Sequence, residues 1–255
     1  MSRRKRSLRN IYILPSLLTS ANFFCGVFAI TQSLSGEFSH AAIAIMCGLF
    51  FDALDGPVAR WNRATSRFGT EYDSLADLVS FGVAPMIMVY QLLATTAGIA
   101  GRVGLGIAFF YSVCAALRLA RYNVQAASGC SDSFSGLPST GAAAFLASYV
   151  LFAEYYQYTG AMARVLPFLM VIVAYLMISN LPYPRVTRAL ARKKRPFISL
   201  VTALLVLVGM ILYVHEALII CFSAFTFYGP AKWLHIRVSR RSSVDVVVQN
   251  QAHQQ

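Results

Sequence analysis

Four aspartates occur as two pairs in one short stretch of an otherwise apolar chain. Asp52 and Asp55 are three residues apart, and Asp73 and Asp77 are four residues apart. These spacings place the two members of each pair on one face of a helix. Converging carboxylates favour hard divalent cations such as Mg²⁺ or Mn²⁺. Two such ions would suit a diphosphate substrate, because they neutralise its phosphates and align it for in-line displacement.

Small and basic residues separate the two acidic pairs. Gly56 and Ala59 would let a bulky ligand approach the helix backbone, and Gly69 breaks the pattern between the pairs. Positive charge for phosphate oxygens would come from three arginines, Arg60, Arg63 and Arg67. A single aspartate with a nearby arginine could equally be a structural ion pair at a helix end. The complete set at these spacings favours a binding site for a phosphate compound.

The elements that must position these residues are apolar helices. The chain has 255 residues, of which 57% are hydrophobic and 13% are charged, and a soluble domain of this size could not bury so much apolar surface. Apolar segments recur, each close to the ~20 residues that a helix needs to cross a bilayer. We therefore expect an all-α integral membrane protein, a polytopic bundle of about eight transmembrane helices at residues 11–34, 41 to the acidic stretch, 77–100, 103–122, 137–158, 165–181, 197–214 and 217–233.

The basic residues predict the orientation of this bundle. A net charge of +12 could indicate nucleic-acid binding in a soluble protein. With eight segments, every Lys and Arg except Arg102 and Arg164 falls on one side of the membrane, which is the positive-inside pattern. We expect both termini and the acidic stretch to face the cytoplasm at the inner membrane. The expected partners include membrane lipids, whose anionic headgroups would meet the basic surface, and no nucleic acid.

The acidic stretch resembles the full signature of the CDP-alcohol phosphotransferase family, D-x2-D-G-x2-A-R-x8-G-x3-D-x3-D, without a departure. The resemblance implies that an alcohol hydroxyl displaces CMP from a CDP-linked lipid, and that the protein is a homodimer. It implies that all four aspartates bind metal and that Asp77 also acts as the general base. It further implies that the cytidine nucleotide or its phosphates are contacted by Gly56, Arg60 and Ser66, with Ala59 and Gly69 in the same site.

Further segments are similar to one branch of this family, the bacterial phosphatidylserine synthases. The similar segments are 14–30, 74–85, 117–123 and 134–140. This resemblance implies that CDP-diacylglycerol is the donor and L-serine the acceptor. The chain departs from the branch at Ser16, where an Asn beside the Pro is common, and at Thr140-Gly141, where a Pro-Ala pair is commoner.

We therefore divide the chain into four expected parts. A basic segment at 1–10 precedes a catalytic domain at 11–195. Two additional transmembrane helices at 196–234 are expected to stabilise the fold without taking part in the chemistry. A polar tail occupies 235–255, and its end after Arg241 is expected to be disordered.

Other polar residues in apolar segments each allow two interpretations. Thr19 and Asn22 lie deep enough to need partners, which could be another helix or the nucleotide. Arg118 and Arg121 could extend their charges to the membrane surface, or could hold the serine carboxylate or the diphosphate. Ser139 belongs to the turn 136–139, a helix start with a proline near its first turn, and this turn could be a helix cap or a loop that binds the acceptor.

Three other functions remain as alternatives. A family member could use another acceptor, glycerol 3-phosphate or inositol phosphate, or could pair serine with an archaeal lipid donor. An intramembrane prenyltransferase also binds a diphosphate with aspartates and Mg²⁺, but its acidic motifs are usually far apart, whereas Asp55 and Asp73 are 18 residues apart. A cation carrier would place carboxylates near the middle of the membrane with access from both sides, and these lie at helix ends.

Overall fold

The computed structural model describes residues 2–61, 67–98, 101–127, 136–181, 183 and 213–252. Across these ranges all regular structure is helical, and no strand occurs. Within the same ranges, five helices are long and apolar enough to cross a membrane: Ser16–Leu34, Phe38–Val58, Phe68–Thr96, Arg102–Gln125 and Val214–Trp233. The expectation of an all-α integral membrane protein is therefore confirmed.

The first half of the described chain is a helical hairpin followed by one long rod. Helices α1 (Ser2–Leu34) and α2 (Phe38–Trp61) pack along each other, joined by a turn in which Gly36 takes a φ of +82°, a conformation that glycine adopts without strain. The rod is built from α3 (Arg67–Asp77), the π-helical turn η1 (Leu78–Val83), α4 (Ala84–Leu92) and a second π-helical turn η2 (Leu93–Ala97).

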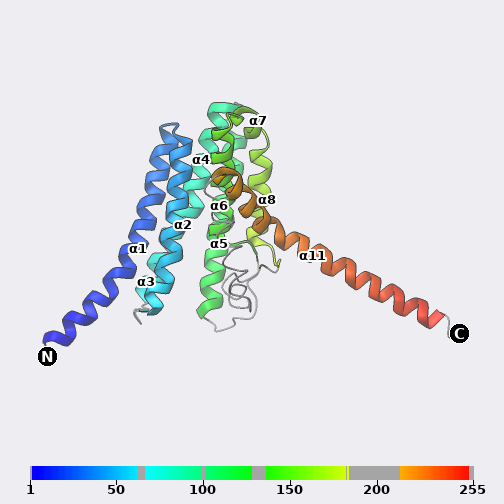
Figure 1. The fold of residues 1–255 in the computed structure, drawn as a ribbon, viewed down its shortest axis with the longest axis horizontal. Coiled ribbons are helices and arrows are strands. Elements are labelled where there is room, and N and C mark those ends of the chain that lie inside the picture. The colour runs from blue at the N-terminus through cyan, green and yellow to red at the C-terminus, as the bar shows by residue number, and fades with distance from the viewer. Residues whose placement is uncertain are drawn as a thin grey trace.

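The second half places one helix at the centre of the bundle. Helices α5 (Arg102–Ala127), α7 (Thr159–Ala163), α8 (Leu166–Ile178) and α11 (Val214–Ala252) lie around or beside α6 (Ser139–Tyr155), as Figure 1 shows. Helix α6 is buried along almost all of its length. Its alanines at 142, 143, 144 and 147 are fully buried or nearly so, because small side chains let neighbouring helices approach closely.

The segment boundaries differ from the expected ones in informative ways. The third segment was expected at 77–100, but its helix begins at Arg67, because the polar residues of α3 give no apolar run. The sixth was expected at 165–181, whereas α8 covers Leu166–Ile178. The expectation that the chain is disordered after Arg241 is wrong: α11 continues to Ala252, and no Gly or Pro follows Pro230 in this helix to stop it. The expected seventh segment, 197–214, lies largely outside the described residues.

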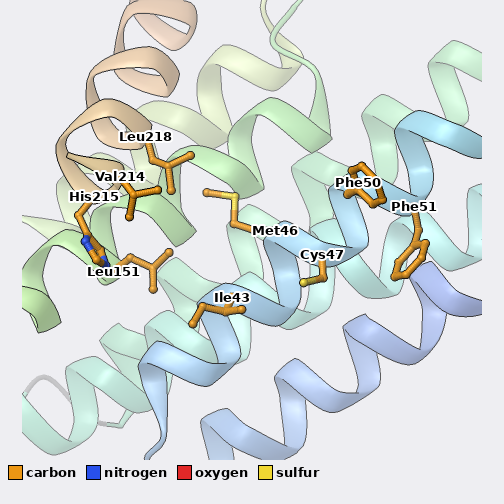
Figure 2. A pocket seen from close by; sticks show the side chains of 9 residues that line it. All are labelled: Ile43, Met46, Cys47, Phe50, Phe51, Leu151, Val214, His215 and Leu218. Carbon is orange, nitrogen blue, oxygen red and sulfur yellow. The ribbon is translucent and has the colours of Figure 1, made fainter. Parts of the chain in front are cut away.

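An apolar cavity of about 400 Å³ opens between α2, α6 and the start of α11. Figure 2 shows side chains from these three helices pointing toward it. The lining residues are Ile43, Met46, Cys47, Phe50, Phe51, Leu151, Val214, His215 and Leu218. Apart from the His215 ring, this lining consists of apolar and sulfur-containing side chains.

Candidate active site

The four aspartates of the acidic stretch converge. Asp52 and Asp55 stand on α2, and Asp73 and Asp77 on α3. Carboxylate oxygens of Asp52, Asp55 and Asp73 all lie within 4.8 Å of one another. The side chain of Asp77 contacts that of Asp52, and the side chain of Asp73 contacts that of Asp55. The structure therefore brings the two pairs together, as the spacing predicted.

This cluster has the features of a site for a divalent cation. Asp55 is buried, and the other three aspartates are half-buried. Asp73 Oδ1 is buried and has no hydrogen-bond partner among the described residues, an arrangement that costs free energy unless another group completes it. Carboxylates this close also repel one another. A group of carboxylate oxygens, one of which lacks a hydrogen-bond partner, fits Mg²⁺ or Mn²⁺. The role of each aspartate as a metal ligand stays a prediction.

Helix α1 supports both aspartate pairs by hydrogen bonds. Thr19 Oγ1 donates to Asp55 Oδ2 at 3.1 Å, and Asn22 Nδ2 donates to Asp77 Oδ1 at 3.0 Å. Thr19 is 5% exposed and Asn22 is fully buried. Of the two interpretations from the sequence, the bond to another helix is confirmed for both residues. A contact with the nucleotide stays a prediction.

Two glycines allow α1 to lie close enough to make these bonds. A Cβ atom on Gly48 of α2 would lie 3.0 Å from Asn22 Oδ1, which is tighter than ordinary van der Waals contact. Gly26 of α1 faces Ser80 so closely that a side chain would not fit. Sequence reasoning assigned nothing to these glycines, although small residues in apolar segments are a general signal of close helix packing.

Helix α1 is also tied to α3 by a residue that the sequence did not single out. The hydroxyl groups of Ser20 and Tyr72 share a hydrogen bond of 2.9 Å. Tyr72 directly precedes Asp73, so this bond fixes the position of α3 beside the carboxylates. Helix α1 packs against both α2 and α3, and it therefore acts as the common support of the site.

The residues that are expected to bind the acceptor lie in two different places. Arg118 Nη1 donates to Ser139 Oγ at 3.0 Å, and the Arg118 guanidinium lies near enough to Asp77 for the two charges to interact. Arg121 instead donates to Asn180 Oδ1 at 2.7 Å, beyond the end of α8. The structure therefore brings Arg118 and Ser139 toward the carboxylates and directs Arg121 to a different partner, Asn180, which sequence reasoning missed.

A turn before α6 positions Ser139. Gly136 takes a φ of +94°, and its N–H donates to the Leu181 carbonyl at 3.0 Å, while the Leu137 N–H donates to the Leu176 carbonyl at 3.0 Å. Gly136 also packs directly on the Met177 carbonyl, where no side chain would fit. The helix begins at Ser139, two residues after the expected start of this segment at 137, and its start is anchored to the end of α8.

The structure describes only some of the residues that are expected to contact the nucleotide. Gly56 of α2 is half-buried, and a Cβ atom there would meet no described atom within 4 Å, so this side of α2 leaves room for a ligand. Gly69 lies in the first turn of α3 and is half-buried. The side chains of Ala59 and Arg60, and Ser66 as a whole, lie outside the described residues.

Comparison with known proteins gives matches over most of the chain. A family model described as CDP-alcohol phosphatidyltransferase matches residues 12–228. A CDP-diacylglycerol–serine O-phosphatidyltransferase of Helicobacter pylori is 32% identical over 229 residues, which cover 89% of this chain and 94% of the relative. An archaetidylserine synthase of Methanothermobacter thermautotrophicus is 37% identical over 186 residues, 71% of this chain and 73% of the relative. A further CDP-diacylglycerol–serine O-phosphatidyltransferase, from Bacillus subtilis, is 34% identical over 175 residues, 67% of this chain and 89% of the relative.

Proposed function

Because the chain belongs to the CDP-alcohol phosphatidyltransferase family, we propose that it transfers the phosphatidyl group of CDP-diacylglycerol to the hydroxyl of L-serine and releases CMP. The observation that carries this proposal is the convergence of the four family aspartates at one end of the bundle. The choice of serine is supported by the names of several relatives that match most of the chain.

The proposed orientation places the aspartates at the cytoplasmic face of the inner membrane. In Figure 1 the outer ends of α1 and α11 extend toward the same side of the bundle as α3, away from α7. Together with the one-sided distribution of Lys and Arg, this arrangement supports a bundle of eight transmembrane helices with both termini in the cytoplasm. The acyl chains of the donor would then stay in the bilayer while its diphosphate reaches the carboxylates.

The residues of the site have defined roles in this reaction. Asp52, Asp55, Asp73 and Asp77 would hold one or two divalent ions, Mg²⁺ or Mn²⁺, which when bound neutralise the diphosphate. Asp77 accepts the proton of the serine hydroxyl as its oxygen attacks the β-phosphorus. The bond between this phosphorus and the bridging oxygen breaks, and CMP leaves with the electron pair. Arg60 contacts the phosphates, as the family signature implies.

The serine is held by a separate group of residues. Arg118 lies near Asp77 and is oriented by its bond to Ser139. A guanidinium in this place binds the serine carboxylate through paired N–H donors and brings the hydroxyl toward the general base. We also propose that the protein is a homodimer, as its resemblance to the family implies.

A panel of substrates tests the choice of acceptor and donor. Purified protein in detergent with Mg²⁺ or Mn²⁺ is incubated with CDP-diacylglycerol and L-serine, glycerol 3-phosphate or inositol phosphate, and the release of CMP is measured. We expect release with serine and background rates with the other two. Preferential turnover of glycerol 3-phosphate or inositol phosphate would overturn the acceptor assignment.

The archaetidylserine synthase among the relatives makes the lipid donor a second variable. The same assay with serine and a CDP-activated archaeal lipid distinguishes the two donors. We expect CDP-diacylglycerol to give the higher kcat/KM. A reversed ratio would leave the serine assignment in place and replace the donor.

A further inference from the structure

We propose that the π-helical turn η1 sets the orientation of Asp73 and Asp77, and that Tyr111 and Ser112 of α5 are positioning residues that hold this turn. The inference rests on the proposed transfer reaction. Turn η1 begins at Leu78, the residue after Asp77. π-Helical turns are rare within α-helices and are frequently found at functional sites. The turn also lies within 74–85, one of the segments that resemble the phosphatidylserine synthases.

Two adjacent side chains of α5 bind two adjacent carbonyl groups of η1. Tyr111 Oη donates to the Phe81 carbonyl at 2.9 Å, and Ser112 Oγ donates to the Gly82 carbonyl at 3.0 Å. Tyr111 and Phe81 are fully buried. An irregular turn in apolar surroundings needs partners for its backbone polar groups, and these hydroxyl groups supply them.

The turn is held on its other side by α1. Ser80 Oγ donates to the Asn22 carbonyl at 2.9 Å, at the point where Gly26 leaves no room for a side chain. The side chain of Asn22 is the donor to Asp77. The same residue of α1 therefore contacts both the turn and the carboxylate that precedes it, so that a change in η1 is transmitted directly to Asp77.

The geometry of helices explains why this turn matters for the carboxylates. Each residue of an α-helix rotates the chain by about 100°. Helix α4 is fixed in the core by buried side chains that include Met88, Val89 and Leu92. A π-helical turn accommodates one residue more than an α-helical turn, so it rotates α3 relative to α4 by about that angle. If η1 relaxed toward an α-helix, Asp73 and Asp77 would turn away from Asp52 and Asp55.

The test removes the two hydroxyl groups and measures metal binding separately from turnover. In the variant Tyr111→Phe/Ser112→Ala we expect the affinity for Mn²⁺, measured by electron paramagnetic resonance without substrate, to fall about tenfold. We expect kcat for CMP release to fall about tenfold as well, because small displacements of catalytic groups have effects up to 10²-fold. The KM for CDP-diacylglycerol should change less than twofold.

Tyr149→Phe is the matched control, because Tyr149 Oη also donates to a backbone carbonyl of another helix, that of Met162 at 3.0 Å. This variant should lose thermal stability to a similar extent and keep its Mn²⁺ affinity and kcat. If the double variant behaved like Tyr149→Phe, η1 would be a packing feature only and the proposal would be overturned.

Single variants keep the proposal testable if the double variant does not fold. Ser112→Ala should weaken Mn²⁺ binding and kcat about threefold, the effect of one modest hydrogen bond, and Ser112→Thr, which keeps the hydroxyl group, should restore both. Equal values for Ser112→Ala and Ser112→Thr would contradict the proposal. If the serine assignment is wrong, the assay of the wild-type protein with different acceptors shows this. The ratios of Mn²⁺ affinity and kcat between variants and wild type do not depend on which acceptor is used.

Discussion

The two ends of helix α2 have different surroundings, polar at the C-terminal end and apolar at the N-terminal end. Toward its C-terminal end, Asp55 accepts a hydrogen bond from Thr19 and contacts Asp73, so polar groups from three helices meet there. Toward its N-terminal end, Ile43 and Met46 line the apolar cavity, whose lining continues along α2 as far as Phe51. The cavity has room for a ligand, but its lining includes no described carboxylate that could bind a cation. The proposed chemistry therefore lies where fixed polar groups are dense, and not where the bundle has an apolar cavity.

The far end of the bundle has its own polar contacts, and they differ in kind. The ring of His215 stacks on that of Tyr155 at 4.1 Å between centroids, and Tyr156 donates a hydrogen bond to Glu216. Tyr155 and Tyr156 are exposed. Aromatic side chains with exposed polar groups are typical of the interface between membrane and water. These contacts anchor α11 to α6, whereas the contacts at the other end orient carboxylates.

The largest expected effect comes from removing one negative charge from the cluster. Asp52→Asn and Asp73→Asn should each lower kcat/KM for CMP release by about 10³-fold, because a lost anionic ligand removes several kcal/mol of charge stabilisation in the transition state. The substituted amide keeps the volume, so the fold should remain. CMP release per folded protein, with folding checked by gel filtration in detergent, provides the measurement. A variant within tenfold of wild type would remove that aspartate from the ligand set.

Asp77→Asn separates metal binding from proton transfer. We expect kcat to fall by about 10²- to 10³-fold, within the usual contribution of a general base, with a smaller loss of Mn²⁺ affinity. Parallel measurement of Mn²⁺ binding and CMP release distinguishes the two roles. Near-normal turnover with the metal retained would contradict the assignment of Asp77 as the base.

The polar end of α2 also shows how far the sequence could predict the structure. The spacing of the aspartates and the apolar segments predicted a membrane bundle and the convergence of the two pairs. The sequence could not identify the partners of Thr19 and Asn22. These partners, Asp55 and Asp77, lie 36 and 55 positions further along the chain, and they come into contact only after the helices have packed. Turn η1 was not foreseen either, since π-helical turns have no residue pattern of their own and depend on partners such as Tyr111 on another helix.

The bonds from α1 should have an intermediate effect. Asn22→Leu keeps most of the side-chain volume and removes the donor to Asp77 Oδ1, so we expect kcat to fall about tenfold, in line with a hydrogen bond to a charged group. Thr19→Val removes the corresponding donor to Asp55 and should act more weakly on kcat and more on Mn²⁺ affinity. If neither variant differed from wild type in these two quantities, α1 would contribute packing alone.

The smallest effect on chemistry is expected at the cavity. Leu151 of α6 is 7% exposed and lines it, so Leu151→Ala would enlarge a space that is already present. We expect thermal stability in detergent to fall, because a truncated buried leucine costs about 2–5 kcal/mol. CMP release per folded protein should stay within twofold of wild type, since none of the residues that line the cavity takes part in the proposed reaction. A loss of activity of tenfold or more without unfolding would show that the apolar end of α2 communicates with its carboxylates, and the separation of the two ends would then be wrong.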